Sequence, residues 1–208
     1  MSEKTKVGSS YQANSPEEQQ AAYDDWAANY EKDLCAMGYR IPAVTAAVFS
    51  RFVPLDCGPI LDAGCGGGIQ AEPLHPAGYG PITGIDFSKG MLDVAREKGF
   101  YTELQQMELG KPLGFADEAF SVVFSIGTIT PRHAPPSSFE ELLRIAKPGA
   151  TFVFSMRNDP TQEPGYPAAL EHHTKNNHWQ HVFSTDGFYS MPYGEPTVTH
   201  QVHVYQKK

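Results

Sequence analysis

The apolar positions of the chain follow a helical spacing near the N-terminus and a strand-like spacing further along. Four of them recur at every fourth residue of the first part: Ala22, Trp26, Tyr30 and Leu34. This spacing predicts an amphipathic helix over residues 19–37, and Ser15 with Pro16 before it is typical of a helix start. A second helix is expected over residues 42–52.

From residue 59 onward, short apolar runs alternate with helical segments. The expected strands are Pro59–Ala63, Ile82–Asp86, Tyr101–Gln105, Ala119–Ile126 and Thr151–Met156. The expected helices between and after them are 90–98, 137–146 (ending at Lys147-Pro148-Gly149) and 168–175. Two late strands, 179–185 and 197–205, are expected to pair at the sheet edge. The alternation predicts an α/β fold, a three-layer sandwich in which helices cover both faces of a mostly parallel sheet.

Composition narrows the class of protein. A chain of 208 residues with 40% hydrophobic content is expected to form one domain, 1–208, with 1–15 as a flexible arm, 16–56 as N-terminal helices and 57–208 as the core. Neither a signal peptide nor a membrane helix is expected, and the three cysteines form no C-x-x-C pair, so a cytoplasmic protein is expected. The net charge of −8 without a basic stripe favours a small-molecule partner over nucleic acid.

A glycine loop carries the strongest chemical signal. The segment 60–68, ILDAGCGGG, is an apolar strand that runs into four glycines, which permit a sharp turn and close approach of a ligand. A dinucleotide fingerprint, G-x-G-x-x-G, fails because its third glycine falls on Ile69 or Ala71. An acid, Asp62, precedes the first glycine, Gly64, by two residues. An anion there suits a cationic ligand better than a pyrophosphate.

A second acid follows at the end of the next expected strand. Asp86 lies 22 residues after Gly64, and a carboxylate at such a strand end can accept two hydrogen bonds from a ribose diol. Asp86 therefore indicates a nucleoside ligand, while a helix cap or a solvent-facing strand end is the alternative. NAD enzymes share such an acid, so the choice between cofactors depends on Asp62 and the missing third glycine.

The pattern Asp62-x-Gly64-x-Gly66-x-Gly68, followed by Asp86, resembles the first motifs of the class I S-adenosylmethionine-dependent methyltransferases. Further segments similar to this superfamily are Met91–Ala95, Met107–Leu109, Phe120–Gly127 and Leu142–Gly149. The N-terminal residues Tyr23–Tyr30 and Gly38–Pro42 are similar to a smaller group, which includes the Williams–Beuren-region methyltransferase-like proteins. The resemblance implies a Rossmann-like, seven-stranded sheet whose last strand is antiparallel.

The resemblance also implies which residues bind S-adenosylmethionine. Asp62, Ala63 and Gly64 would hold the methionine moiety, with Gly66 in the same loop. Asp86 and Phe87 would hold the ribose, and Met107 with Glu108 the adenine. The other implied cofactor residues are Met91, Ile126, Gly127, Tyr23 and Tyr30, the last two covering the cofactor from the N-terminal helix unless they serve only core packing.

Two departures from the superfamily pattern stand out. Pro73 and Pro76 fall where a helix should follow the glycine loop, and an interior proline costs a helix about 3 kcal/mol. This helix is therefore expected to be short, kinked or restarted at Pro73. Where many relatives carry an acid after the phenylalanine of the fourth strand, this chain has Ser121.

The loop after the fourth strand holds the candidate catalyst. His133 is expected to act as general base or to position the acceptor, because its charge can change near neutral pH; a bond to nearby backbone is the bland alternative. Arg132, the residue before it, is expected either to bind an acidic substrate or to be solvated. The aromatic segment 188–193 forms either a wall of an acceptor pocket or part of the sheet edge. Four late histidines match no metal-ligand spacing, so no metal is expected: His172, His173, His178 and His181.

The function expected from these features is methyl transfer from S-adenosylmethionine to a small-molecule acceptor. Three rivals remain open: a methyltransferase fold that catalyses a non-methylating reaction such as a cyclisation, a module that only binds the cofactor, and an NAD oxidoreductase.

Overall fold

The computed structural model describes residues 15–131, 133–160 and 162–208. The expected arm therefore lies almost wholly outside the described residues, as does Arg132. The described part of the chain begins with two helices, α2 (Pro16–Ala36) and α3 (Ile41–Phe52), close to the predicted ranges. Ser15 caps α2, since its hydroxyl accepts a hydrogen bond from the Glu18 amide at 3.2 Å.

An eight-stranded sheet forms the centre of the molecule. Its strands are β1 (Ile60–Ala63), β2 (Ile82–Asp86), β3 (Glu103–Gln106), β4 (Phe120–Ser125), β5 (Ala146–Arg157), β6 (Trp179–Ser184), β7 (Phe188–Tyr189) and β8 (Thr199–Lys207). The order is β3-β2-β1-β4-β5-β8-β6, and the two-residue β7 pairs with β8 beside this path. Strands β1 to β5 are parallel, and β8 runs antiparallel to its neighbours. The predicted antiparallel last strand is thus confirmed, inserted between β5 and β6. The sheet has eight strands instead of the predicted seven, because the two-residue β7 adds a short pairing to β8.

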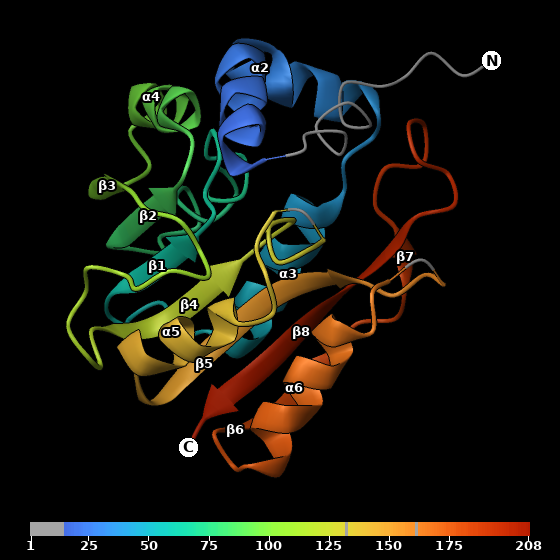
Figure 1. Cartoon of the computed structure of the whole chain (residues 1–208). Coiled ribbons are helices and arrows are strands. Elements are labelled where there is room, and N and C mark those ends of the chain that lie inside the picture. The colour runs from blue at the N-terminus through green and yellow to red at the C-terminus, as the bar shows by residue number, and fades with distance from the viewer. Residues whose placement is uncertain (1–14, 132, 161) are drawn as a thin grey trace.

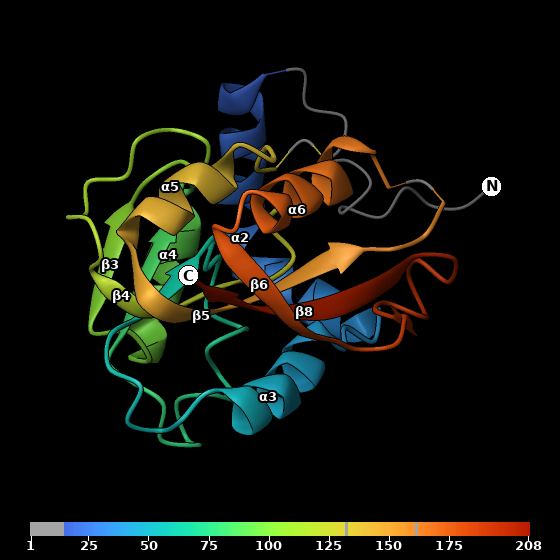
Figure 2. The ribbon, with the colours of Figure 1, turned by 90° about the horizontal axis from the view of Figure 1, so that it is seen from below.

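Helices cover both faces of this sheet. Figure 2 shows α5 (Ser138–Ile145) and α6 (Gly165–Lys175) on one face and α3 on the other. The core on the α5 side includes Phe139, Phe154 and Trp179, and the core on the α3 side includes Phe49 and Phe124. Because each core joins one helical layer to the sheet, the predicted three-layer α/β sandwich is confirmed.

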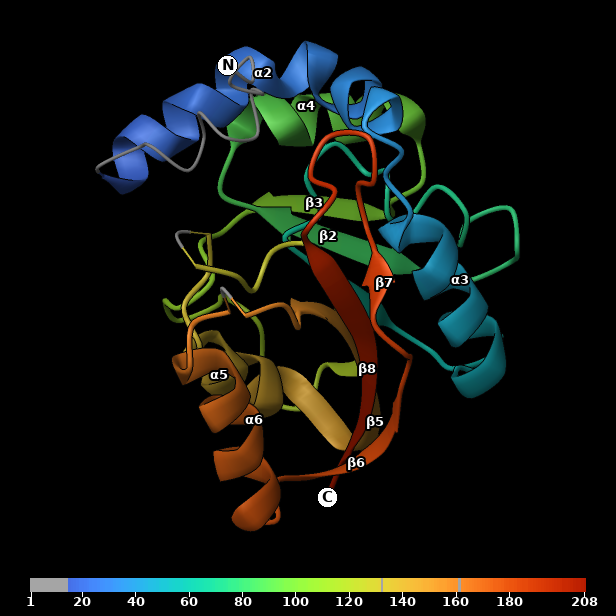
Figure 3. The same ribbon diagram turned by 90° about the vertical axis from the view of Figure 1, so that its right-hand side faces the viewer.

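Helix α2 lies across one end of the molecule and packs against α4 (Lys89–Lys98), as Figures 1 and 3 show. The contact is polar: one oxygen of Asp24 accepts hydrogen bonds from the Ser88 hydroxyl at 2.6 Å and the Gly90 amide at 2.8 Å. Lys98 on α4 forms an ion pair with Glu31 on α2. These contacts fix the face of α2 that carries Tyr23 and Tyr30.

The segment after the glycine loop is not a helix. Residues 66–78 form turns and a bend, and within them only the Glu72 and His75 amides make α-helical i→i−4 bonds, to the carbonyls of Gly68 and Ala71. The expected short or kinked helix is therefore wrong. The reason is the one that predicted a weakened helix: Pro73 and Pro76 lack the amide hydrogens that further helical bonds require.

The strand boundaries differ most from the predicted ones where pairing with a strand distant in sequence sets them. Strand β3 begins two residues later than predicted, and β5 begins at Ala146, so Lys147-Pro148-Gly149 lies inside a strand rather than in a breaker. Ala146 pairs with Phe120 across an irregular register, which extends β5 beyond its apolar run. The late hairpin is confirmed as the antiparallel pair β6 and β8.

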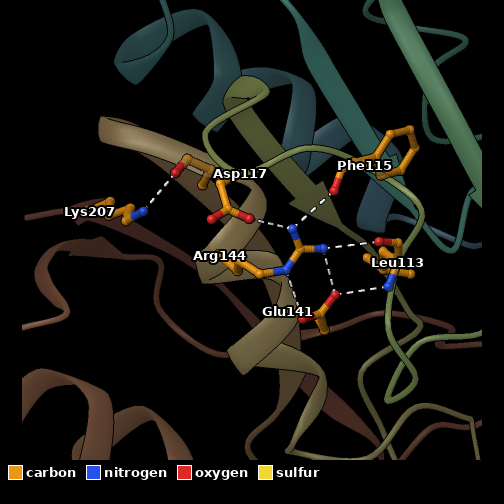
Figure 4. A network of polar contacts seen from close by, with 7 residues as sticks. Leu113, Phe115, Asp117, Glu141, Arg144 and Lys207 are labelled. Carbon is orange, nitrogen blue, oxygen red and sulfur yellow. Dashed lines mark hydrogen bonds and ion pairs between the residues drawn. The ribbon is translucent and has the colours of Figure 1, made fainter.

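An arginine network ties the segment after β3 to α5 (Figure 4). Arg144 donates hydrogen bonds to both oxygens of Glu141, to Asp117, and to the carbonyls of Leu113 and Phe115, at 2.7–2.9 Å. A guanidinium suits this role because its five donors have a fixed geometry. The network holds the chain that follows residues 107–111, which form part of the cavity described next. Within the three described ranges, no helix combines the length and apolar character needed to cross a membrane.

Candidate functional site

The candidate site lies where the strand order reverses. Strand β1 has β2 on one side and β4 on the other, so the connections from β1 and β4 leave the sheet in opposite directions. In open α/β sheets, ligands bind outside the carboxyl ends of the strands at this switch point. The glycine loop, Asp86 and the segment after β4 all follow the carboxyl ends of these strands.

A cavity of about 300 Å³ opens at this position. A volume of this size is at the lower end of the range for small-molecule sites. The predicted residues that line it are Tyr23, Tyr30, Gly64, Gly66, Asp86, Phe87, Met91, Met107, Glu108, Ile126, Gly127 and His133. Twelve residues chosen from sequence thus surround one cavity, although their binding roles stay predictions.

Asp86 forms the polar wall of the cavity at the end of β2. Its two oxygens accept hydrogen bonds from the amides of Ser88 and Gly66, each at 2.9 Å. Burial raises the pKa of Asp86 to about 6, although these amide bonds act in the opposite direction. The carboxyl is therefore mostly ionised at neutral pH. Because an ionised carboxylate has about four acceptor positions, it can still accept bonds from a ligand diol.

The glycine loop approaches the cavity with its backbone. Gly64 has φ +86°, and a Cβ on this residue would overlap the Thr128 side chain. Thr128 in turn donates a hydrogen bond to the Gly64 carbonyl at 3.1 Å. Gly66 has φ +51°, and a Cβ there would meet no described atom within 4 Å. Gly64 therefore serves close packing between the β1 and β4 loops, whereas Gly66 keeps its side of the cavity open.

Asp62 and Ala63 are placed behind the cavity wall rather than on it. Both are fully buried, and one oxygen of Asp62 accepts a hydrogen bond from the Tyr101 hydroxyl at 2.8 Å. Burial raises the pKa of Asp62 to about 8, with a smaller contribution from the Asp86 charge. Asp62 is therefore largely neutral at pH 7, which differs from the anion expected from sequence. That Asp62 and Ala63 hold the methionine moiety stays a prediction.

The raised pKa makes the effect of Asp62 on stability depend on pH. Because the folded-state pKa lies above the unfolded value of 3.8, the stability of the wild type falls as pH rises from about 4 to about 8. Asp62→Asn cannot ionise and escapes this loss, which is at most about 1.4 kcal/mol for each pH unit within that window. We expect the unfolding free energy of Asp62→Asn, relative to wild type, to rise between pH 5 and pH 9 in urea titrations. Asp56→Asn, at an exposed position, is the control, and an equal pH dependence of both variants would contradict the assignment.

His133 and Tyr23 form a pair on the cavity wall. The Tyr23 hydroxyl lies 2.5 Å from His133 Nε2, and His133 Nδ1 lies 3.2 Å from the Pro131 carbonyl. A carbonyl only accepts, and the Thr130 hydroxyl, 3.0 Å from the same nitrogen, can also accept. A proton on Nδ1 therefore fits both contacts and leaves Nε2 to accept from the tyrosine. Burial lowers the pKa of His133 to about 4. The imidazole is therefore neutral at pH 7. His133 lines the cavity, and it also makes the contact with nearby backbone that was the alternative to a catalytic role.

Sequence reasoning missed several residues of the cavity wall. They are Gln19, Gln70, Ile85, Leu109, Gly110, Lys111, Thr128, Ala134 and Pro135. Most adjoin predicted residues in sequence and follow from them once the loops are placed. Gln70 carried no signal, because no motif marks a glutamine in a turn; it is buried and donates a hydrogen bond to the Ile126 carbonyl at 3.1 Å.

The other candidate groups are placed as follows. In the aromatic segment, Phe188 and Tyr189 form β7 and pair with β8, whereas Met191 is buried beside α2; a role of this segment in an acceptor pocket stays a prediction. His173 bonds to His178, Nδ1 to Nδ1, at 2.9 Å. Within the described part of the chain, no group of three or more potential ligands is arranged for a metal ion.

The residues present fit the S-adenosylmethionine that the sequence resemblance implies. Two buried polar atoms on residues that line the cavity, Gln19 Nε2 and Gln70 Oε1, have no partner among the described residues. Such atoms are costly unless a ligand or water satisfies them. Together with the Asp86 carboxylate and the open side of Gly66, they match a ligand that has an amino-acid part and a ribose.

Comparisons with known proteins agree with this geometry. Residues 61–154 match a family described as a methyltransferase domain. Human methyltransferase-like protein 27 is 32% identical over 155 residues, which are 72% of this chain and 61% of that protein. Demethylmenaquinone methyltransferase of Renibacterium salmoninarum is 29% identical over 158 residues, 72% of this chain and 62% of that protein. The chain thus spans about three fifths of the length of these relatives.

A solved structure supports the fold in particular. The TehB-like S-adenosylmethionine-dependent methyltransferase of Corynebacterium glutamicum superposes with a TM-score of 0.66 at 18% identity, covering 90% of this chain and all of that one. At this identity the likeness concerns the fold alone. The matched domain, the human relative and the cavity at the switch point lead to one conclusion. The chain belongs to the class I S-adenosylmethionine-dependent methyltransferase superfamily, whose cofactor is S-adenosylmethionine.

Proposed function

We propose that this protein transfers the methyl group of S-adenosylmethionine to a small-molecule acceptor. The observation that carries the proposal is the cavity at the switch point, in which the glycine loop and Asp86 meet the β4 loop. The name of the Renibacterium relative, a demethylmenaquinone methyltransferase, supports a small-molecule acceptor. The charge of −8 supports it too, because a nucleic-acid acceptor calls for a basic surface.

In this proposal, each wall of the cavity has one task. Asp86 accepts hydrogen bonds from the ribose hydroxyls, and Phe87, Met91 and Met107 give the base apolar surroundings. Gly66 leaves room for the cofactor beside the loop. Helix α2 closes the cavity with Tyr23 and Tyr30, which excludes water from the reacting atoms. The bound cofactor supplies a methyl group on a sulfonium, a leaving group that needs no further activation.

The remaining chemistry is removal of a proton from the acceptor. The neutral His133 can receive it at Nε2, because burial keeps the ring unprotonated at neutral pH. The Tyr23 hydroxyl is hydrogen-bonded to that nitrogen, so the proton reaches it through the hydroxyl. The hydroxyl gives its own proton to His133 and takes one from the acceptor. Tyr23 and His133 therefore act as one proton-accepting pair.

Transfer of an isotopically labelled methyl group tests the proposal. The protein is incubated with labelled S-adenosylmethionine and, separately, with the metabolite, protein and nucleic-acid fractions of a cell extract. The expected result is label in the metabolite fraction, with release of S-adenosylhomocysteine. Label in nucleic acid or protein would contradict the small-molecule acceptor. A new product formed while the cofactor stays intact would show the rival non-methylating reaction instead.

A further inference from the structure

A second, smaller cavity adjoins the cofactor cavity. It has a volume of about 50 Å³ and shares four wall residues with the first: Tyr23, Tyr30, Gly127 and His133. It extends from them toward the carboxyl end of β5 and the start of β8. Space for an acceptor group is therefore present directly beside the proton-accepting pair.

Aromatic side chains form the α2 side of this second cavity. Trp26 and Tyr39 line it together with Tyr23 and Tyr30. The Trp26 and Tyr30 rings meet edge to face, with centroids 4.8 Å apart, and the Trp26 indole is held by a 2.7 Å hydrogen bond to Asp33. Aromatic rings attract cations that lie over their negative faces.

Three residues that ordinarily carry charge lie in or beside the opposite wall: Arg157, Asp159 and Glu195. Arg157 donates from Nε and Nη2 to the two oxygens of Asp159, at 3.0 and 3.1 Å, which offsets part of the arginine's charge. The other charged residue in the described wall is Glu195, whose burial raises the pKa of its carboxyl. His200 is neutral at pH 7, because burial lowers its pKa to about 4.

A buried acceptor position lines the same cavity. His200 is only 5% exposed, it lines the second cavity, and its Nδ1 has no partner among the described residues. A neutral imidazole nitrogen can accept a hydrogen bond from a ligand N–H group. The cavity thus combines aromatic walls, one carboxylate and one unsatisfied ring nitrogen.

Glu195 is held in place by the backbone of the loop before β8. The Arg40 amide donates to the Ser190 carbonyl at 2.9 Å, and the Tyr193 amide donates to the Met37 carbonyl at 3.1 Å. The Glu195 amide donates to the Met191 carbonyl at 2.7 Å. The loop is therefore fixed to the end of α2, and the backbone of Glu195, a residue that lines the second cavity, is held in place.

We propose that the second cavity binds a basic nitrogen of the methyl acceptor, as an ammonium group held between the aromatic walls, Glu195 and His200. This inference rests on the proposed function and narrows its acceptor to small molecules that carry a basic amine. Neutral and acidic molecules of the same shape bind less well, because the aromatic faces and the carboxylate attract positive charge.

Calorimetry on the protein saturated with S-adenosylhomocysteine tests this inference. The probes are benzylamine, benzyl alcohol and benzoate, which share a ring but differ in charge at neutral pH. We expect benzylamine to bind most tightly, and its affinity to fall roughly tenfold or more in Glu195→Gln. The control is Glu97→Gln on the exposed side of α4, which should leave benzylamine binding unchanged. Both variants should retain wild-type affinity for S-adenosylhomocysteine and wild-type melting temperature.

The outcomes separate the two proposals. Equal binding of benzylamine and benzyl alcohol, tighter binding of benzoate, no binding of benzylamine, or no effect of Glu195→Gln would each overturn the amine site while S-adenosylhomocysteine still binds. Failure of S-adenosylhomocysteine to bind would instead refute the cofactor site, and with it the proposed function. A melting temperature lowered in Glu195→Gln calls for Glu195→Asp, which keeps the charge and should restore preference for the amine.

Discussion

Asp86→Ala is expected to lower the affinity for S-adenosylmethionine by about two orders of magnitude or more. The variant loses the carboxylate that we propose accepts two bonds from the ribose, and hydrogen bonds to charged groups contribute about 1.5–3 kcal/mol each. It also removes the acceptor of the Gly66 and Ser88 amides, which fix the glycine loop against the end of β2. Titration calorimetry with S-adenosylmethionine and S-adenosylhomocysteine measures the loss directly.

Asp93→Ala is the matched control for this variant. Asp93 lies on the exposed face of α4, where its ion pairs with Lys89 and Arg96 are solvated and contribute little. The affinity for the cofactor should not change there. In the wild type, affinity should also fall as pH drops below about 6, because protonation of Asp86 removes two acceptor positions. Equal affinity of the wild type and Asp86→Ala for the cofactor at all pH values would contradict the role of Asp86 in cofactor binding.

Gly64→Ala is expected to destabilise the fold and abolish cofactor binding together. At φ +86° a side chain is strained, and its Cβ would overlap Thr128, which is itself fixed by hydrogen bonds to the carbonyls of Gly64 and Ile126. Backbone strain and overpacking each cost on the order of 1–3 kcal/mol, so we expect a loss of about 3 kcal/mol in the unfolding free energy. Urea unfolding followed by circular dichroism measures it.

Gly99→Ala separates strain from steric overlap. Gly99 ends α4 with φ +70°, and a Cβ there would meet no described atom within 4 Å. The backbone strain alone should cost this variant about 1 kcal/mol, with cofactor binding unchanged. An equal loss of stability in both variants would show that the contact between Gly64 and Thr128 has no energetic role.

The parts of the site that sequence predicted are those set by local chemistry. The β1–loop–β2 unit was recognisable because an apolar run, a set of glycines and a strand-end acid lie within 27 residues, Ile60–Asp86. The parallel strands that follow place the carboxyl ends of β1, β2 and β4 at one edge. Once these are adjacent, Gly64, Asp86 and Gly127 must face a common cavity.

The parts that sequence did not predict depend on distant contacts. Asp62 is neutral because burial raises its pKa, although the hydrogen bond from Tyr101, 39 residues later, acts in the opposite direction; spacing alone cannot show such burial. The second cavity joins α2 to the loop before β8, so Trp26 and Glu195 meet only in the folded chain. The start of β5 at Ala146 likewise follows from pairing with β4 and not from its own residues.

Calorimetric titration of the wild-type protein with S-adenosylmethionine, S-adenosylhomocysteine and NAD tests the assignment of the cofactor cavity most directly. We expect both sulfur nucleosides to bind at one site and NAD not to bind, since the glycine loop lacks the third glycine of the dinucleotide fingerprint. Binding of NAD alone, or of none of the three, would contradict the assignment of the cavity to S-adenosylmethionine.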